Sequence, residues 1–270
     1  MATVTRVGAM SDYLWPEGAL PRRPERPESA GKHPGAAGKD PESAGEHPGA
    51  AAFVPDKGGL DDLRTAARSC KGCHLFRNAT QTVFGRGDAS ARLVLVGEQP
   101  GDVEDQRGLP FVGPAGLLLR RAVGEVDLDP AEIYITNAVK HFKFTQSGAG
   151  RRRIHQTPDR TEIVACRPWL VAEFARLDPK VVVVLGATAA QAILGPTFRV
   201  TRSRGVLMPW PASAHPAEDF TPPPRPGRAP RADAVVMATL HPSAILRADD
   251  RDKAYAGFVA DLAVAANALR

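Results

Sequence analysis

The chain has 270 residues, enough for one large domain and a tail, and its apolar fraction of 43% is ordinary for a globular protein. Its 35 Lys and Arg against 30 Asp and Glu give a formal charge of +5, which suits a polyanionic partner without establishing one. No apolar run reaches the length of a membrane span, the first residues lack the apolar core of a secretion signal, and three cysteines exclude a disulfide framework. We therefore expect a cytoplasmic monomer with no membrane partner.

The N-terminal part is repetitive. Residues 27–51 read PESAGKHPGAAGKD followed by PESAGEHPGAA, a near-exact repeat without a periodic apolar face. Two such units cannot stack into a core, so we expect residues 1–58 to form a disordered tail and residues 59–270 to form the domain. The Tyr-Leu-Trp triplet at 13–15 is either a docking peptide or part of a solvated tail.

Helical spacing of apolar residues over 59–70 begins the domain. Short runs rich in Val and Ile then suit parallel strands covered on both faces, at 91–98, 132–139, 180–186 and 234–240. Helical patterns alternate with them, at 115–126, 160–177, 188–195 and 253–269. The alternation predicts an α/β three-layer sandwich with a central four-stranded parallel sheet flanked by helices. Residues 209–232 are Pro-rich and unperiodic, which indicates a surface insertion.

Each predicted strand leads directly into residues capable of chemistry. The four segments are GEQPGD (97–102), TNAVKH (136–141), LGATAA (185–190) and LHPSAIL (240–246). Any one of them is typical of turns and helix caps. Because the carboxyl ends of parallel strands meet at one edge, where ligands bind, the four together favour a functional site. A separate stretch, SGAGRRRIHQTP (147–158), is predicted to be a basic loop that ends in an Ile-His pair.

These motifs, together with GLPFVGPAG (108–116), resemble the uracil-DNA glycosylase superfamily, specifically its iron-sulfur family 4 branch. Within that branch, the stretch RRRIH resembles the signature of the UDGX subgroup. The resemblance covers about residues 60–265, and the motifs occur in the family's order. It implies the uracil-DNA glycosylase fold, uracil-containing DNA as the substrate in single- or double-stranded form, and free uracil as a product.

The resemblance also implies roles for residues at the strand ends. Breaking the bond between uracil and the sugar C1' leaves an oxocarbenium-like sugar and a uracil anion. Glu98 would stabilise the sugar cation, and His241 would donate to the uracil O2 as charge develops. Asn137 matches the O4 and N3–H edge of uracil and mismatches the amino group of cytosine. Phe111 would stack on the base, although it equally suits the core.

Further residues of the same segments are expected to shape the pocket or to contact DNA. Gln99 and Asp102 would line the uracil pocket. Ser243 would contact the DNA backbone beside the lesion. Ile245 or Leu246 would fill the gap left by the flipped base, or both would pack at the start of the last helix.

The basic stretch suits phosphate contacts, which bind DNA without reading its sequence. The arginines concerned are Arg151, Arg152 and Arg153. Ile154, the next residue, is expected to pin the stretch against the domain.

In the UDGX subgroup, the histidine that ends this stretch attacks C1' and stays attached, which places His155 as the nucleophile. A neutral imidazole oriented by a carboxylate such as Glu98 is competent for this attack. Two alternatives remain open. The first is a conventional multiple-turnover glycosylase, in which His155 positions DNA or water. The second is a non-catalytic, metal-stabilised nucleic-acid-binding module.

The cysteines form a candidate metal site. Cys70 and Cys73 make a CxxC pair, and Cys166 is a third thiolate. His141 is the best candidate for the fourth ligand, with His74 as a competitor. By ligand type, zinc and a [4Fe-4S] cluster fit equally well. The resemblance implies the cluster, in a structural role, with His141 at a position where family 4 carries cysteine, a departure in which this sequence resembles the UDGX subgroup.

Overall fold

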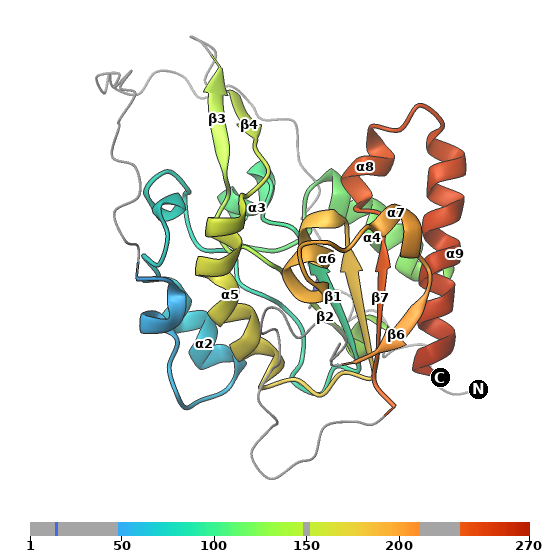
Figure 1. Ribbon diagram of the computed structural model, residues 1–270, viewed down its shortest axis with the longest axis horizontal. Helices are drawn as coiled ribbons and strands as arrows, with labels where there is room; N and C mark the ends of the chain where they lie inside the picture. The colour runs from blue at the N-terminus through green and yellow to red at the C-terminus, as the bar shows by residue number, and fades with distance from the viewer. Residues whose placement is uncertain (1–13, 16–47, 148–151, 211–232) are drawn as a thin grey trace, which may run out of the picture.

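The computed structural model describes residues 14–15, 48–147, 152–210 and 233–270 (Figure 1). The central sheet has the order β2-β1-β5-β7-β6. Its strands are β1 (Leu93–Gly97), β2 (Ile133–Asn137), β5 (Val181–Leu185), β6 (Leu207–Pro209) and β7 (Val235–Thr239). All of them are parallel except β6, which pairs antiparallel with β7 at the edge. The predicted parallel α/β sandwich is confirmed, and β6 is a fifth strand that the sequence did not predict.

Helices cover both faces of the sheet, because alternate strand residues point to opposite sides. Val94 packs in the cluster with α2, α5 and α6, whereas Leu95 packs with α4, α8 and α9. Every residue of β1, β2 and β5 is buried, which explains their continuous apolar runs. The helices are α2 (Leu60–Ala67), α3 (Asp102–Arg107), α4 (Pro114–Glu125), α5 (Arg160–Phe174), α6 (Ala187–Leu194), α7 (Val200–Ser203), α8 (Pro242–Leu246) and α9 (Arg251–Leu269). Short 3-10 turns are η1 (Ala50–Phe53), η2 (His74–Arg77) and η3 (Pro130–Glu132).

The stretch predicted to be a basic loop is half of a β-hairpin. Strands β3 (Phe144–Ser147) and β4 (Arg152–His155) pair antiparallel, apart from the central sheet. Figure 1 shows the hairpin at the end of the sheet toward which β1, β5 and β7 run. Ile154 is 42% exposed, so the prediction that it pins this stretch to the domain is wrong. Arg151 lies outside the described residues.

The folded part begins before the predicted boundary at residue 58. Turn η1 packs against α5, and its Ala50 is buried in the core. Leu14 and Trp15, from the Tyr-Leu-Trp triplet, are buried among the side chains of α4 and α9. These contacts correct the boundary. The rest of the predicted tail, residues 1–13 and 16–47, lies outside the described residues.

The predicted insertion also needs a correction at its start. Pro209 belongs to β6, and Trp210 is buried against Phe174 with ring centroids 5.0 Å apart. Residues 211–232 lie outside the described part of the chain.

Among the helices that the structure describes, none has both the length and the apolar character required to cross a bilayer.

A buried ion pair joins the end of β2 to α5. The Lys140 ammonium contacts Glu173 at 2.5 Å and donates to Thr136 Oγ1 at 2.7 Å and to the Asn137 carbonyl at 2.8 Å. The second Glu173 oxygen accepts from Tyr134 and Thr136 at 2.8 and 2.9 Å. Both charged side chains are fully buried. Because each charge has several partners, the pair holds the carboxyl end of β2 in a single position.

Glu173→Gln should lower the free energy of unfolding by about 3–5 kcal/mol, because it leaves the Lys140 charge buried without a counter-charge. The matched control is Glu132→Gln, which breaks the partly exposed pair with Arg92 and should cost at most about 1 kcal/mol. Equilibrium unfolding in urea measures both. Equal losses in the two variants would contradict the assignment.

Candidate active site

Two side chains converge on Gly97, the last residue of β1, at the carboxyl end of the parallel strands. Gly97 pairs with Asn137, and a Cβ at Gly97 would lie 2.4 Å from Asn137 Oδ1 and 2.5 Å from Phe111 Cζ. Asn137 is 2% exposed, and its Oδ1 has no hydrogen-bond partner among the described residues. Leaving such an acceptor unsatisfied costs about 1–3 kcal/mol. This oxygen is therefore free to accept a hydrogen bond from an N–H donor that is not part of the described chain.

The Phe111 ring forms one wall of this space. Its backbone lies in the left-handed region, with φ 53°, which is unfavourable for a bulky residue. The loop is held there by Glu104, which accepts a hydrogen bond from the Gly113 amide at 2.8 Å. The ring is 5% exposed, and its centroid lies 6.0 Å from the ring of His241. Phe111 thus belongs to the core and also faces the site.

His241 caps the N-terminus of α8. Its Nδ1 accepts from the Ser243 amide at 3.2 Å and lies 2.8 Å from the Ser243 hydroxyl. With Nδ1 occupied as an acceptor, the ring proton is on Nε2. Burial, followed by the charges of His155 and Arg247, lowers the pKa of His241 to about 4. His241 is therefore a neutral donor at physiological pH.

The Glu98 carboxylate is held between two elements. Thr188, in the first turn of α6, donates to Oε2 at 2.5 Å, and Oε1 lies 3.5 Å from His155 Nε2. The turn before α6 lies close to His241, since a Cβ at Gly186 would be 2.8 Å from the Cβ of His241. Glycine also permits the φ of +88° at this position. Thr188 was not among the predicted site residues, although a hydroxyl in the first helical turn after a strand end is a local signal for such a contact.

The proton on His155 can be placed from its contacts. Gln99 Oε1 accepts from the Lys143 amide at 2.9 Å, and Nε2 donates to the carbonyls of Lys143 and Gln156, which fixes the orientation of the amide. Gln99 Nε2 also lies 2.9 Å from His155 Nε2. Because an amide nitrogen only donates, this contact favours the tautomer in which His155 Nε2 accepts and Nδ1 carries the ring proton, with the two amide hydrogens shared among three acceptors. Burial is the main cause that lowers the pKa of His155 below its usual value. The ring thus presents a lone pair beside Glu98.

Arg153 anchors the hairpin to α3. Its guanidinium pairs with Asp102 and Asp105, and it lies over the rings of Phe142 and Phe144 at 5.3 and 5.0 Å. Asp105 is fully buried. Asp102 was predicted to line the uracil pocket and Arg153 to contact phosphate, but their charged groups are paired with each other. The ion pairs of Arg153 with Asp102 and Asp105 therefore attach the hairpin to the domain, the role that was predicted for Ile154.

The remaining predicted DNA contacts differ in exposure. Arg152 is exposed on β4, on the side opposite Arg153. Ser243 is half-buried beside His241. Ile245 is 1% exposed in the core, so its predicted role as a wedge in DNA is wrong. Leu246 is half-buried and remains the candidate for that role.

The three cysteines are buried close enough to influence one another. Burial raises the pKa of Cys73 to about 11 and that of Cys166 to about 12, and the charge of Cys70 adds to both shifts. Trp169 Nε1 donates to Cys70 Sγ, and the Lys140 amide donates to Cys166 Sγ, each at 3.2 Å. Within the described ranges, no three His, Cys, Asp or Glu side chains are grouped as ligands of a single metal ion. Cluster ligands bind different iron atoms, so they lie further apart.

His141 is prepared as a ligand through Nδ1. The Thr82 hydroxyl donates to the Ala67 carbonyl at 2.8 Å, so it accepts from His141 Nε2 at 3.0 Å and leaves a lone pair on Nδ1. Burial lowers the pKa of His141 to about 4. The competing candidate, His74, has its Nε2 3.2 Å from a Glu162 carboxylate oxygen. The donor set of three thiols and one neutral imidazole fits a cluster or zinc.

Comparison with known proteins identifies the family. The sequence profile of the uracil DNA glycosylase superfamily matches residues 84–263. The chain belongs to this superfamily. It is 37% identical over 144 residues to the type-4 uracil-DNA glycosylase of Thermotoga maritima, covering 53% of this chain and 70% of that protein. It is 31% identical over 192 residues to the type-4 uracil-DNA glycosylase of Sulfurisphaera tokodaii, covering 69% and 76%. The predicted superfamily and family 4 branch are confirmed, whereas the UDGX subgroup stays a prediction.

The neutral state of His241 should make the glycosylase domain less stable in acid. Its pKa is about 4 when folded and 6.5 when exposed, so the unfolded chain binds the proton first as pH falls. Wild type should therefore lose on the order of 3 kcal/mol more than His241→Asn between about pH 7 and about pH 4. Asn keeps a helix-capping acceptor and removes the titrating ring. Urea unfolding at several pH values measures the difference, and parallel profiles would contradict it.

Proposed function

We propose that this protein excises uracil from DNA and then becomes bonded through His155 to C1' of the abasic sugar. The observation that carries the proposal is the accepting Nε2 of His155, 3.5 Å from Glu98 Oε1, at the same sheet edge as the unsatisfied Asn137 Oδ1. The type-4 uracil-DNA glycosylases among the relatives support uracil as the base that is removed.

Recognition of uracil rests on Asn137 and Phe111. Asn137 Oδ1 would accept from the uracil N3–H, and its amide nitrogen would donate to O4. Cytosine has an unprotonated N3 and an amino group at C4, so it would oppose both contacts. Phe111 would stack on the flipped base, and the cost of holding its backbone at φ 53° is consistent with a ring that must face a ligand.

Cleavage breaks the C1'–N1 bond, and the electron pair leaves on uracil. His241 Nε2–H would donate to the uracil O2 as negative charge develops there, and the neutral ring needs no proton from solvent to do so. Glu98, held by Thr188, would stabilise the positive charge on the sugar. The uracil anion then takes a proton from solvent.

Trapping follows from the tautomer of His155. The Nε2 lone pair gives up its hydrogen bond from the Gln99 amide and forms a bond to C1', which leaves a cationic ring with a proton on Nδ1. Glu98 Oε1 is positioned to stabilise that cation, and Nδ1 subsequently releases its proton to solvent. The product is a histidine N-glycoside, because the sugar cation is consumed by the imidazole before water reaches it.

Contacts to the DNA strand would come from the same edge. Arg152 is exposed on β4 and suits a phosphate contact, and Arg151, outside the described residues, is proposed for the same role. Leu246 would enter the gap left by the flipped base, and Ser243 would contact the backbone while it holds His241.

Wild-type protein mixed with a uracil-containing oligonucleotide should give a heat-stable band of reduced mobility on a denaturing gel. His155→Ala should give none, because it removes the nucleophile. The matched control is Ile154→Ala, an exposed neighbour on the same strand that faces away from Glu98 and should retain the band.

Two other results would replace the proposal. Free abasic product from wild type without the shifted band would indicate a conventional multiple-turnover glycosylase. No excision by wild type, with uracil-independent DNA binding that weakens steeply with salt, would indicate a non-catalytic binding module.

We also propose that a [4Fe-4S] cluster is held by Cys70, Cys73, Cys166 and His141. Three buried thiols close enough to influence one another support this, because thiolates and a neutral imidazole are ligand types that iron-sulfur clusters use. Bound there, the cluster would supply structural stability, because base excision involves no electron transfer. It would join the segment after α2 to α5 and to the end of β2.

Cys166→Ser should remove iron and acid-labile sulfide from anaerobically purified protein and lower its melting temperature, because one cluster ligand is lost. His74→Ala should retain both, since that ring is paired with Glu162. Metal and sulfide analysis measures the outcome. Zinc without sulfide in wild type would favour a zinc site. Wild type that contains no iron and no zinc would contradict the proposal.

A further inference from the structure

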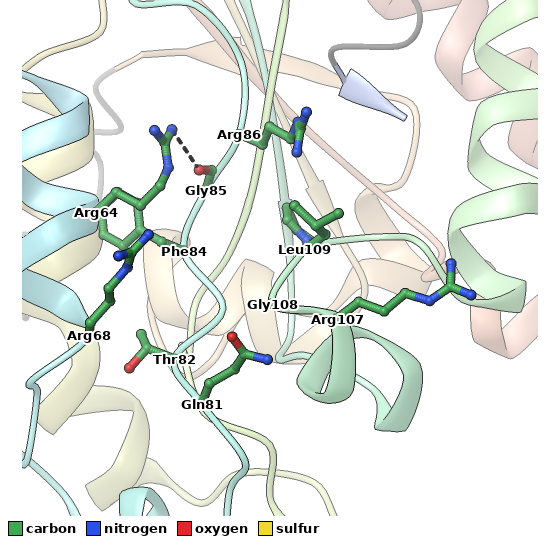
Figure 2. A pocket seen from close by; sticks show the side chains of 11 residues that line it. Arg64, Arg68, Gln81, Thr82, Phe84, Gly85, Arg86, Arg107, Gly108 and Leu109 are labelled. Atoms are coloured by element: carbon green, nitrogen blue, oxygen red, sulfur yellow. Dashed lines mark hydrogen bonds between the residues drawn. The ribbon is translucent and has the colours of Figure 1, made fainter. Parts of the chain in front are cut away.

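A cavity of about 540 Å³ lies away from the candidate active site, between α2, the segment 81–86 and the loop 107–110. Its volume falls within the range of about 300–1,000 Å³ that is usual for small-molecule sites. Figure 2 shows Arg64 and Arg68 on one side and the loop with Gly108 and Leu109 on the other, with the extended segment between them. The Arg107 side chain of this loop extends away from Arg64 and Arg68.

Four of the eleven residues that line this cavity are arginines, namely Arg64, Arg68, Arg86 and Arg107. None of its described lining residues is Asp or Glu. Arg86 and Arg107 also interact with other parts of the protein, so Arg64 and Arg68 are the main candidates for an anion contact. Arg64 Nη2 donates to the Gly85 carbonyl at 3.2 Å, which holds that guanidinium at the rim, and its Nη1 pairs with the exposed Asp61. Arg68 is exposed and makes no ion pair with a described residue.

The floor of the cavity offers no competing charge and no stacking surface. A Cβ at Gly85 would lie 2.3 Å from Glu173 Oε1, so the floor rests on the buried pair with Lys140, whose charges cancel. The Phe84 ring is 4% exposed and packs edge-on against Trp169. The ligand that these walls favour is therefore an anion with several oxygen acceptors, such as a phosphate group, and not a stacked base.

We propose that this cavity is a second phosphate-binding site, separate from the catalytic edge. Its phosphates come either from the DNA strand that flanks the excised base or from a free polyphosphate. The first source rests on the proposed function and extends it, because the loop 107–110 leads directly to Phe111 and would connect the two sites.

The test compares Arg64→Gln/Arg68→Gln with Arg120→Gln/Arg121→Gln, a pair on α4 outside the cavity with the same loss of charge. Glutamine is a good helix former, so both should fold. If the double variant is unstable, Arg68→Gln alone replaces it in the test, because this single change removes the charge of an exposed side chain. Uracil-free single strands of two lengths, one covering the active site only and one much longer, are titrated by anisotropy over a range of salt.

If flanking DNA is the source, the cavity variant should bind the longer strand several-fold more weakly, with its salt slope reduced by up to about two, whereas the control and the short strand change little. If a free polyphosphate is the source, DNA binding should be unchanged, and inorganic tripolyphosphate should bind wild type and not the cavity variant in calorimetry. No difference in either titration would overturn the proposal.

Adduct formation on a short uracil oligonucleotide separates the two proposals. The cavity variant should retain the adduct. Absence of the adduct in wild type would refute the proposed chemistry. The titrations with uracil-free DNA and tripolyphosphate would still test the phosphate site, because they do not depend on adduct formation.

Discussion

Strand β1 lies between β2 and β5, hydrogen-bonded to both in parallel register, and the pairing places Gly97 directly opposite Asn137. Parallel strands end at one edge, so the segments that follow them must cross the same small region. A glycine there leaves a space that the ring of Phe111 and the amide of Asn137 enter together. Glu98, the next residue, then emerges between α6 and the hairpin. The positions of Phe111, Asn137 and Glu98 therefore depend on this register.

Two histidines at this edge have opposite hydrogen-bonding roles, although both are neutral. His241 accepts at Nδ1 from a backbone amide of α8, which leaves Nε2 as a donor. His155 accepts at Nε2 from the Gln99 amide, whose orientation is fixed by the Lys143 backbone. The partner of each ring, and not its pKa, decides which nitrogen carries the proton. One ring thus has a donor at Nε2, whereas the other has an acceptor at Nε2.

Ion pairs connect segments of the chain in addition to the hydrophobic packing on the two faces of the sheet. A two-stranded hairpin is marginally stable alone, so β3–β4 depends on Arg153, which pairs with Asp102 and the buried Asp105. The Lys140–Glu173 pair similarly ties the end of β2 to α5. Each pair joins segments distant in sequence, and each has additional hydrogen bonds that offset the cost of burying charge.

The sequence by itself determined the parallel strands, because continuous Val-rich runs suit strands buried on both faces, and it determined the family through the motifs that follow them. It predicted the positions of Glu98, Asn137 and His241, since a strand end is a local signal. Only the tertiary structure decided that three residues form β6, that Arg153 anchors the hairpin while the neighbouring Ile154 is exposed, and that Thr188 holds Glu98. Strand β6 exists because its three residues pair with β7, beyond the segment 211–232. The contacts of Arg153 and Thr188 depend on partners 48 to 90 residues away in the chain, which no local pattern of residues specifies.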